Sequence, residues 1–157
     1  MTPDTRFTHA AAALGCSFDG EIKAGGNYLP LRRDGHTLYV SGQVPRIANT
    51  VVVTGRVGRQ VDLHQAQRAA KICTLRALAL LQRELGSLSQ VQQVLRMTVY
   101  TQSDEGFTQL SEVADGASDL LHEVLGEAGR HARTSVGVYQ LPKNASVELD
   151  LIVAAQP

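Results

Sequence analysis

An arginine and a glutamate near the carboxyl-terminal end are the residues best suited to carry chemistry. Arg133 offers a planar fork of donors that matches a carboxylate or a phosphate. Glu148, fifteen positions later, can act as a general base or hold a water molecule. Both residues are also compatible with an ordinary charged surface, because exposed charges dominate the surface of most domains. These two residues by themselves leave a reactive site and a solvated surface as alternatives.

The segment that carries both residues, 133–153, is predicted to form two strands. Glu148 lies on one parity of the second strand, and an apolar set lies on the other, which indicates one buried face. Residues 141–144 have turn composition. A hairpin closed there would pair Glu148 near Tyr139 and leave Arg133 roughly 20 Å away. We therefore expect either a bulged sheet or a site shared with a neighbouring subunit.

The remaining pattern predicts an α+β fold. Strands are expected in the first third, after a short helix at 6–15. The later elements alternate between helix and strand, and the first of these helices opens with a capping box at Asp62–Gln65. The expected strands are 28–31, 37–44, 51–53 and 91–101, and the two long helices are 62–85 and 110–125. We expect one domain, 1–157, with a mixed sheet and two helices packed on one face.

Three further residues raise alternatives that the sequence leaves open. Gly42 interrupts a predicted strand, which indicates either a bulge or a close approach by a ligand or another backbone. Asp115 and Asp119, four positions apart on a helix, could hold a cation, although a solvated face is the simpler interpretation.

Composition excludes several classes of function. The 157 residues are 43% apolar and 19% charged, with no formal net charge, so no overall field attracts nucleic acid or an anionic membrane. Residues 1–80 carry ten Lys and Arg against five Asp and Glu, and residues 81–157 carry five against ten, giving +5 and −5. This asymmetry is compatible with contact between copies of the chain.

The sequence shows no membrane span, secretion signal, zinc-ligand spacing or phosphate-binding glycine loop. Cys16 and Cys73 are expected to be reduced thiols in a cytoplasmic protein, with Cys73 in the core. We therefore expect no metal and no organic cofactor.

Several segments together resemble the RidA/YjgF family of reactive enamine/imine deaminases, historically also labelled L-PSP endoribonucleases. The similarity spans roughly residues 25–155, and the block from Arg133 through Leu141-Pro142 to Glu148 is its most specific part. The helix sequence Gly116-Ala-Ser-Asp-Leu-Leu121 resembles one branch of the family. The other segments that carry the resemblance are Tyr39–Gln43, the helix after Val61-Asp62-Leu63, and His131–Val138.

The resemblance implies a chorismate-mutase-like α+β fold and a homotrimer with ligand sites between subunits. It implies that Arg133 grips a substrate carboxylate while Glu148 holds or activates the water that attacks an imine carbon. The products would be a 2-oxo acid and ammonia, with no metal or cofactor.

The resemblance also implies pocket positions. Tyr28, Ser41 and Gly42 match positions that line the pocket, and backbone groups near Ser135 would add hydrogen bonds. The chain departs from the family pattern at Asp115, where Asn is common, and at Ser135, where Cys is frequent in the deaminase branch.

Three hypotheses follow. The first is a hydrolytic deaminase of 2-imino or 2-enamino acids. The second is a non-catalytic trimer that binds small carboxylates as a sensor or regulator. The third is an endoribonuclease, which the composition supports least because only the amino-terminal half is basic.

Overall fold

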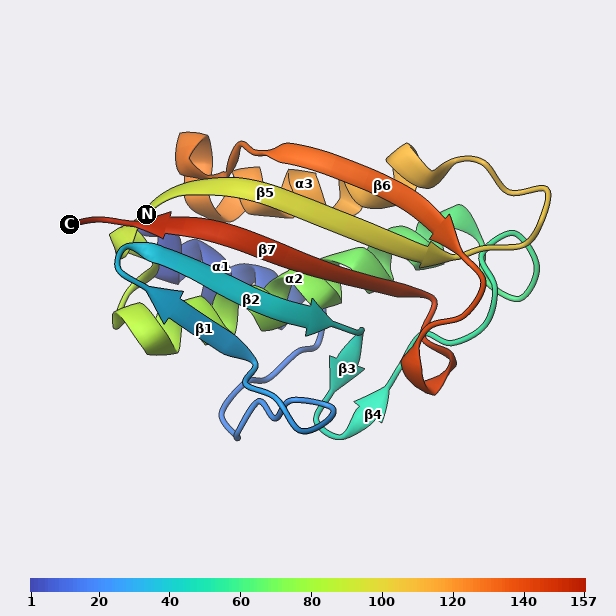
Figure 1. Ribbon diagram of the computed structural model, residues 1–157, viewed down its shortest axis with the longest axis horizontal. Coiled ribbons are helices and arrows are strands. Elements are labelled where there is room, and N and C mark those ends of the chain that lie inside the picture. Colours follow the sequence, from blue (N-terminus) through green and yellow to red (C-terminus); the bar gives the residue numbers. More distant parts are fainter.

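The computed structural model describes all residues, 1–157, as a mixed sheet covered on one face by helices (Figure 1). The strand order is β1-β2-β7-β5-β6, in which only β5 and β6 run parallel. The strands are β1 (Leu31–Asp34), β2 (Thr37–Gln43), β5 (Val91–Gln102), β6 (Ala132–Val138) and β7 (Val147–Ala155), with a separate small hairpin of β3 (Arg46–Ile47) and β4 (Thr50–Val51). The expectation of an α+β fold with a mixed sheet is confirmed.

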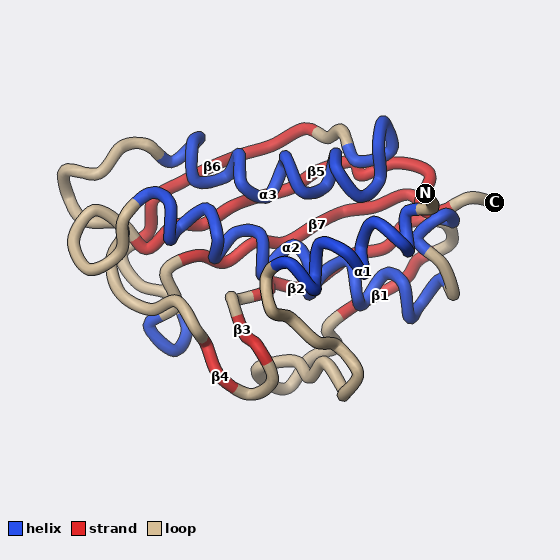
Figure 2. The backbone as a smooth tube through the Cα atoms, turned by 180° about the vertical axis from the view of Figure 1, so that it is seen from behind, coloured by secondary structure: helices blue, strands red, loops and turns tan.

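Three helices lie on the same side of this sheet, as the view from behind shows (Figure 2). They are α1 (Pro3–Ala13), α2 (Leu63–Leu85) and α3 (Leu110–Leu125). Helices α2 and α3 pack against each other, and α1 packs on both of them. The two long helices were expected, and α1 adds a third that begins at Pro3 rather than at residue 6. None of the helices combines the length and the apolar composition that a membrane-spanning segment requires.

Helix α2 begins and ends where the sequence predicts. The Gln65 backbone N–H donates to Asp62 Oδ1 at 2.8 Å, and the Asp62 N–H donates to Gln65 Oε1 at 2.9 Å. These two bonds satisfy donors that the first helical turn leaves free. Gly86 ends the helix with a φ of 82°, a left-handed conformation that glycine adopts without strain.

Strand β7 forms the centre of the core. Its apolar residues alternate with polar ones and face the helices, with no more than 1% of each exposed: Val147, Leu149, Leu151 and Val153. The opposite face of the strand carries Glu148 and Asp150, each partly exposed. The strict alternation therefore fixes the side of the sheet on which Glu148 lies.

The predicted hairpin between the last two strands is wrong. Strand β5 lies between β6 and β7 and pairs with both. Helix α3 returns the chain to the start of β5, so β6 runs parallel to it. The turn residues predicted to close the hairpin instead form a 3₁₀ turn, Pro142–Asn144, in which Lys143 and Asn144 are left-handed. This turn carries the chain past the end of β5 to begin β7 on its other side.

Two strand boundaries also differ from the expectation. Residues 28–30 precede β1, and β4 stops at Val51 rather than at residue 53. The first segment is instead tied to β2, since the Ser41 backbone N–H donates to the Pro30 carbonyl at 2.9 Å.

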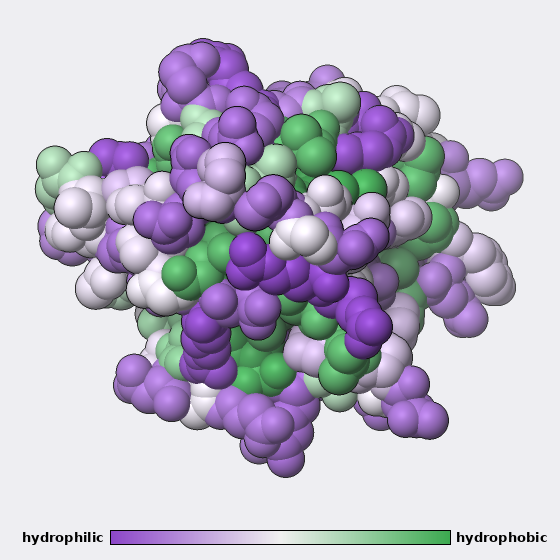
Figure 3. Space-filling view, turned by 60° about the vertical axis from the view of Figure 1, so that its left-hand side comes forward, coloured by the Kyte–Doolittle hydropathy of each residue, from purple (hydrophilic) through white to green (hydrophobic).

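The second face of the sheet carries no helix. Apolar side chains on this face remain exposed, among them Tyr39 at 46% and Val136 at 36%. Turned by 60° so that the left-hand side of Figure 1 comes forward, the molecular surface shows apolar groups interspersed with polar ones (Figure 3). A sheet face that is partly apolar and uncovered within one chain is compatible with contact between copies.

Candidate functional site

Glu148 lies at the start of β7, opposite a bulge in the neighbouring strand β2. The pairing of β2 with β7 shifts between Val40 and Gln43, and Gly42 sits in this irregular stretch. A Cβ added at Gly42 would overlap the Glu148 Oε2 atom and would lie 2.9 Å from its Cδ. The bulge, one of the two alternatives left open at Gly42, is therefore present, and the absence of a side chain there makes room for the carboxylate.

The surroundings of Glu148 raise the pKa of its carboxyl group. Burial raises the pKa of this carboxyl above its usual value, and the nearby Asp150 charge raises it further. Burial also raises the pKa of Asp150, although its bond to the Tyr100 hydroxyl, 3.3 Å from Oδ2, acts in the opposite direction. A carboxylate with a raised pKa accepts a proton more readily, which suits a general base.

A cavity of about 210 Å³ brings together Glu148, Gly42 and Tyr28. The Tyr28 side chain is half exposed, and its hydroxyl accepts a hydrogen bond from the Gly25 backbone N–H at 3.3 Å. Ser41 does not line this cavity. Its hydroxyl donates to the Leu29 carbonyl at 2.7 Å and so fastens the segment that carries Tyr28.

The same cavity contains basic residues that the sequence did not single out. Arg76 on α2 and Arg46 on β3 line it, together with the exposed Lys23 and Lys143. Arg76 is only 6% exposed, and the nearby Arg46 charge contributes, after burial, to lowering its pKa. The sequence did carry one signal for Arg76: it is a charged residue within the mostly apolar part of α2 that the structure buries.

Arg133 lies on β6 and points toward α3, where neighbouring side chains hold its guanidinium. Nη1 donates to Asp115 Oδ1 at 2.8 Å and to the Ser118 hydroxyl at 3.0 Å. Nη2 donates to the Ser111 carbonyl at 3.3 Å and to its hydroxyl at 3.2 Å. The side chain of Arg133 is 20% exposed and that of Asp115 is 54% exposed, so this ion pair lies at the surface. Asp115 therefore acts as the counterion of Arg133, and Asp119 takes no part in the pair.

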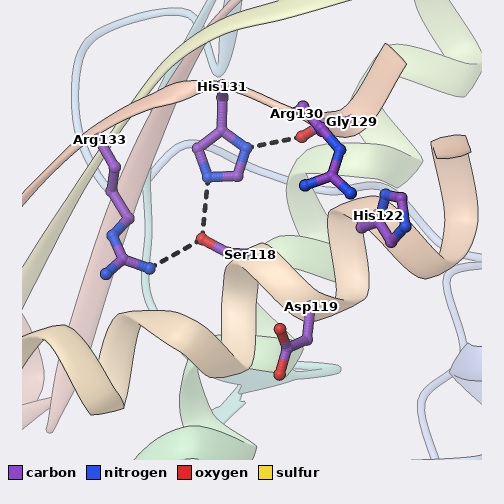
Figure 4. Close-up of a pocket in the computed structure, with 7 residues that line it drawn as sticks. All are labelled: Ser118, Asp119, His122, Gly129, Arg130, His131 and Arg133. Atoms are coloured by element: carbon purple, nitrogen blue, oxygen red, sulfur yellow. Dashed lines mark hydrogen bonds between the residues drawn. The ribbon is translucent and has the colours of Figure 1, made fainter. Parts of the chain in front are cut away.

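Ser118 also connects Arg133 to His131 (Figure 4). The Gly129 carbonyl can only accept, so His131 Nδ1, 2.6 Å away, carries a proton. In the neutral ring Nε2 then accepts from the Ser118 hydroxyl at 2.9 Å. The chain of bonds fixes the orientation of the serine oxygen that Arg133 contacts. These groups line an open cavity of about 540 Å³ with no hydrophobic residue in its lining.

Ser135 lies two positions further along β6. It pairs with Val99 of β5, whose side chain is in the core, so Ser135 faces the helix side as Arg133 does. Its hydroxyl oxygen is buried and has no hydrogen-bond partner. An unpaired buried polar atom at this position is one of three in the chain.

The structure therefore separates the expected site residues into two groups. Tyr28, Gly42 and Glu148 share one cavity, whereas Arg133, Asp115 and Ser135 belong to another region. Glu148 pairs with Tyr100 and Arg133 pairs with Met97, three residues apart along β5 and on opposite faces of the sheet. Strands β6 and β7 are two strand spacings apart, and the two positions differ by three residues along the strands. Their Cα atoms are therefore roughly 14 Å apart. The distance of 20 Å expected from a hairpin was wrong, but Arg133 and Glu148 remain apart within one chain, as expected.

Other candidates for chemistry are not supported by their surroundings. Cys16 and Cys73 are both free thiols. Cys73 is fully buried, and burial raises its pKa well above the usual value, so it is a core residue as expected. No group of three or more His, Cys, Asp and Glu side chains is placed to hold a metal ion.

Comparison with known proteins places these residues in a family. Residues 9–154 match the family described as "YjgF/chorismate mutase-like, putative endoribonuclease". Protein TCP17 of Trypanosoma cruzi is 40% identical over 141 residues, covering 89% of this chain and 88% of TCP17.

Solved structures agree with this match. The protein Atu1372 of Agrobacterium tumefaciens, described as of unknown function, is 40% identical with a TM-score of 0.87, covering 99% of this chain and 95% of that one. A putative endoribonuclease from Shewanella oneidensis is 30% identical with a TM-score of 0.88, covering 98% and 99%. Escherichia coli TdcF, solved with bound serine, is 22% identical with a TM-score of 0.58, covering 85% and 91%, and shares the fold.

Proposed function

Because this chain belongs to the YjgF/chorismate mutase-like family and holds a half-buried glutamate in a cationic cavity, we propose that it hydrolyses reactive 2-imino or 2-enamino acids. The observation that carries the proposal is the environment of Glu148. Its carboxylate is partly desolvated, has a raised pKa and lies beside Gly42, where no side chain blocks access.

The proposed reaction needs only the groups of the chain and water. Glu148 takes a proton from a water molecule while the water oxygen bonds to the imine carbon. The proton then passes to the nitrogen, which gives a carbinolamine. Its hydroxyl proton is next transferred to the nitrogen, again through Glu148, and the C–N bond breaks as the C=O bond forms, so that ammonia leaves. The carbon retains the oxygen as the carbonyl of a 2-oxo acid, so no metal, cofactor or oxidant is consumed.

We propose that Arg133 binds the substrate carboxylate from a neighbouring copy of the chain. Within one chain Arg133 and Glu148 lie on opposite faces of the sheet, so they cannot meet on one small molecule. Arg133 is on the edge strand β6, and the uncovered sheet face is partly apolar. An assembly of copies, proposed here as a homotrimer, would bring the two regions together at each subunit interface.

Ammonia release from freshly generated 2-iminopropionate or 2-iminobutyrate tests this function. We expect the wild type to exceed the spontaneous rate, and Arg133→Ala to raise the KM strongly, because one charge-assisted contact is lost. A wild-type rate no faster than that of Arg133→Ala would contradict the proposal. Sedimentation of the wild type tests the trimer separately.

One observation favours a second candidate, a non-catalytic trimer that binds small carboxylates as a sensor or regulator. Asp115 already pairs with Arg133 and partly cancels its charge, and this lowers the affinity of the fork for a substrate anion. This candidate predicts saturable binding of a 2-oxo acid that needs Arg133, with no ammonia release above the spontaneous rate.

A further inference from the structure

Arg46 and Arg76 form a pair of like charges without an acidic partner. The structure contains four ion pairs, and none involves either residue. Every other contact of Arg76 is to a neutral group: Nε donates to Gln43 Oε1 at 3.1 Å, and Nη1 donates to the Arg46 carbonyl at 3.2 Å. No hydrogen bond satisfies Nη2.

The side chain of Arg46 is even less satisfied. It donates no hydrogen bond: its Nε is buried without a partner, and its two terminal nitrogens are accessible but unpaired. Burying a guanidinium without an anion is unfavourable, and placing a second one beside it adds repulsion. Arg76 is only 6% exposed. Both it and Arg46 nonetheless line the same cavity as Glu148. An anion entering this cavity would satisfy free donors of both side chains.

The charge of the cavity agrees with this inference. Four cationic side chains line it, and Glu148 is its only carboxylate. Its volume of about 210 Å³ is below the roughly 300–1,000 Å³ of sites for drug-sized ligands, so the anion must be small. By contrast Arg133 already has a carboxylate, Asp115, at 2.8 Å.

We propose that Arg46 and Arg76 bind an acidic group of the substrate that is distinct from the carboxylate assigned to Arg133. The substrate class is then 2-imino acids with a second anionic group, carboxylate or phosphate, on the side chain. This inference rests on the proposed function, which supplies the imine, and adds which imines are preferred.

Direct binding tests the anion site without requiring turnover. We expect succinate and inorganic phosphate to bind the wild type in calorimetric titrations, and whichever binds more tightly identifies the acidic group. Arg76→Gln and Arg46→Gln should each weaken this binding by roughly 10- to 100-fold, as expected for loss of a hydrogen bond to a charged group. Arg68→Gln is the matched control, since it removes an exposed arginine of the same helix. Binding of both anions that is unchanged in Arg76→Gln and Arg46→Gln would overturn the proposal.

Kinetics then test the substrate class. We expect kcat/KM to be higher for the imine of aspartate than for the imine of alanine, and Arg76→Gln to abolish this preference. Turnover of both imines without a preference would refute the inference and leave the proposed function intact. Absence of turnover with either imine would refute the proposed function, and the titrations would still decide the anion site.

One more outcome would overturn the inference. If the two arginines instead met carboxylates of a neighbouring copy, Arg76→Gln would change the sedimentation coefficient of the assembly and leave succinate and phosphate binding unaffected. We expect the sedimentation of Arg76→Gln and Arg46→Gln to equal that of the wild type.

Discussion

Arg133 and the pair formed by Arg46 and Arg76 show two opposite ways of holding arginine in one molecule. Arg133 lies near the surface, and an aspartate and two serines of α3 occupy its fork. Arg76 is buried and Arg46 is partly buried, and they have only neutral partners or none. An arginine near the surface that has a counterion costs little stability. Two neighbouring arginines without an acidic partner destabilise the folded state unless an anion binds to them.

The difference also separates two roles. Arg133 is held in one orientation before any ligand arrives, and its charge is partly cancelled by Asp115. The Arg46 and Arg76 pair retains its full charge beside Glu148, the proposed base. We therefore assign orientation of the substrate to Arg133 and attraction of anions to Arg46 and Arg76.

The largest expected effect is that of Glu148→Gln. Gln keeps the size of the side chain but cannot take a proton from water, so kcat should fall by roughly 10²- to 10⁴-fold. Binding of a 2-oxo acid should persist because the cationic groups remain. Steady-state ammonia release measures the first effect, and Glu84→Gln, an exposed change on α2, serves as control. Retention of more than half the wild-type kcat would remove Glu148 from the reaction.

A methyl group at Gly42 should have the next largest effect. In Gly42→Ala the new Cβ overlaps the Glu148 carboxylate, which must move, and misplacement of a catalytic group by about 1 Å can cost about 100-fold in rate. The thermal unfolding temperature should change little, because the displaced group is the flexible end of a side chain. Gly20→Ala is the control, since a Cβ there meets nothing within 4 Å. Equal kcat values for the two variants would show that the position of Glu148 is unimportant.

A smaller effect is expected when Arg133 is released from its counterion. Asp115→Asn keeps an oxygen that can accept from Arg133 Nη1 but removes the negative charge. Because Asp115 is more than half exposed, the gain is limited, and the KM for 2-iminopropionate should fall by roughly two- to fivefold. Asp119→Asn, which leaves the ion pair intact, should not change it. A raised KM in Asp115→Asn would mean that the aspartate itself helps to bind the substrate.

The smallest effect is a shift in pH dependence. Since the pKa of Glu148 is raised, the acid limb of kcat/KM should lie above the pH at which a solvent-exposed glutamate titrates. Asp150→Asn removes the second cause of the shift and should move this limb to lower pH, with little change in the rate at neutral pH.

The same variant should alter the pH dependence of stability. A carboxyl whose folded pKa is raised binds its proton more tightly in the folded state, so stability falls as pH rises from the unfolded pKa through the folded one. Asp150→Asn should therefore lose less stability than the wild type between pH 4 and neutral pH in thermal unfolding. An identical pH profile for the two proteins would contradict the assigned cause of the shift.

The sequence predicted those features that follow from local patterns. The capping box at Asp62 and the alternation around Glu148 correctly gave a helix start and the exposed side of a strand. The position of β6 could not be read in this way, because turn composition at 141–144 is the same whether the next strand pairs with its predecessor or crosses to another partner. Only the parallel pairing of β6 with β5 decides between these arrangements.

The candidate site was predictable only in part. Tyr28, Gly42 and Glu148 do share a cavity, but Arg46 and Arg76 were missed. The only local signal for Arg76 was its position in the apolar part of α2, and Arg46 had none. The role of Asp115 as counterion of Arg133 likewise depends on α3 lying beside β6, a contact between elements distant in sequence.

A crystal structure with a bound four-carbon 2-oxo diacid would test the central claim most directly. We expect its keto carbon beside Glu148, one carboxylate on Arg46 and Arg76, and the other on Arg133 of a neighbouring copy. A monomeric protein, or a diacid bound away from Glu148, would contradict the account.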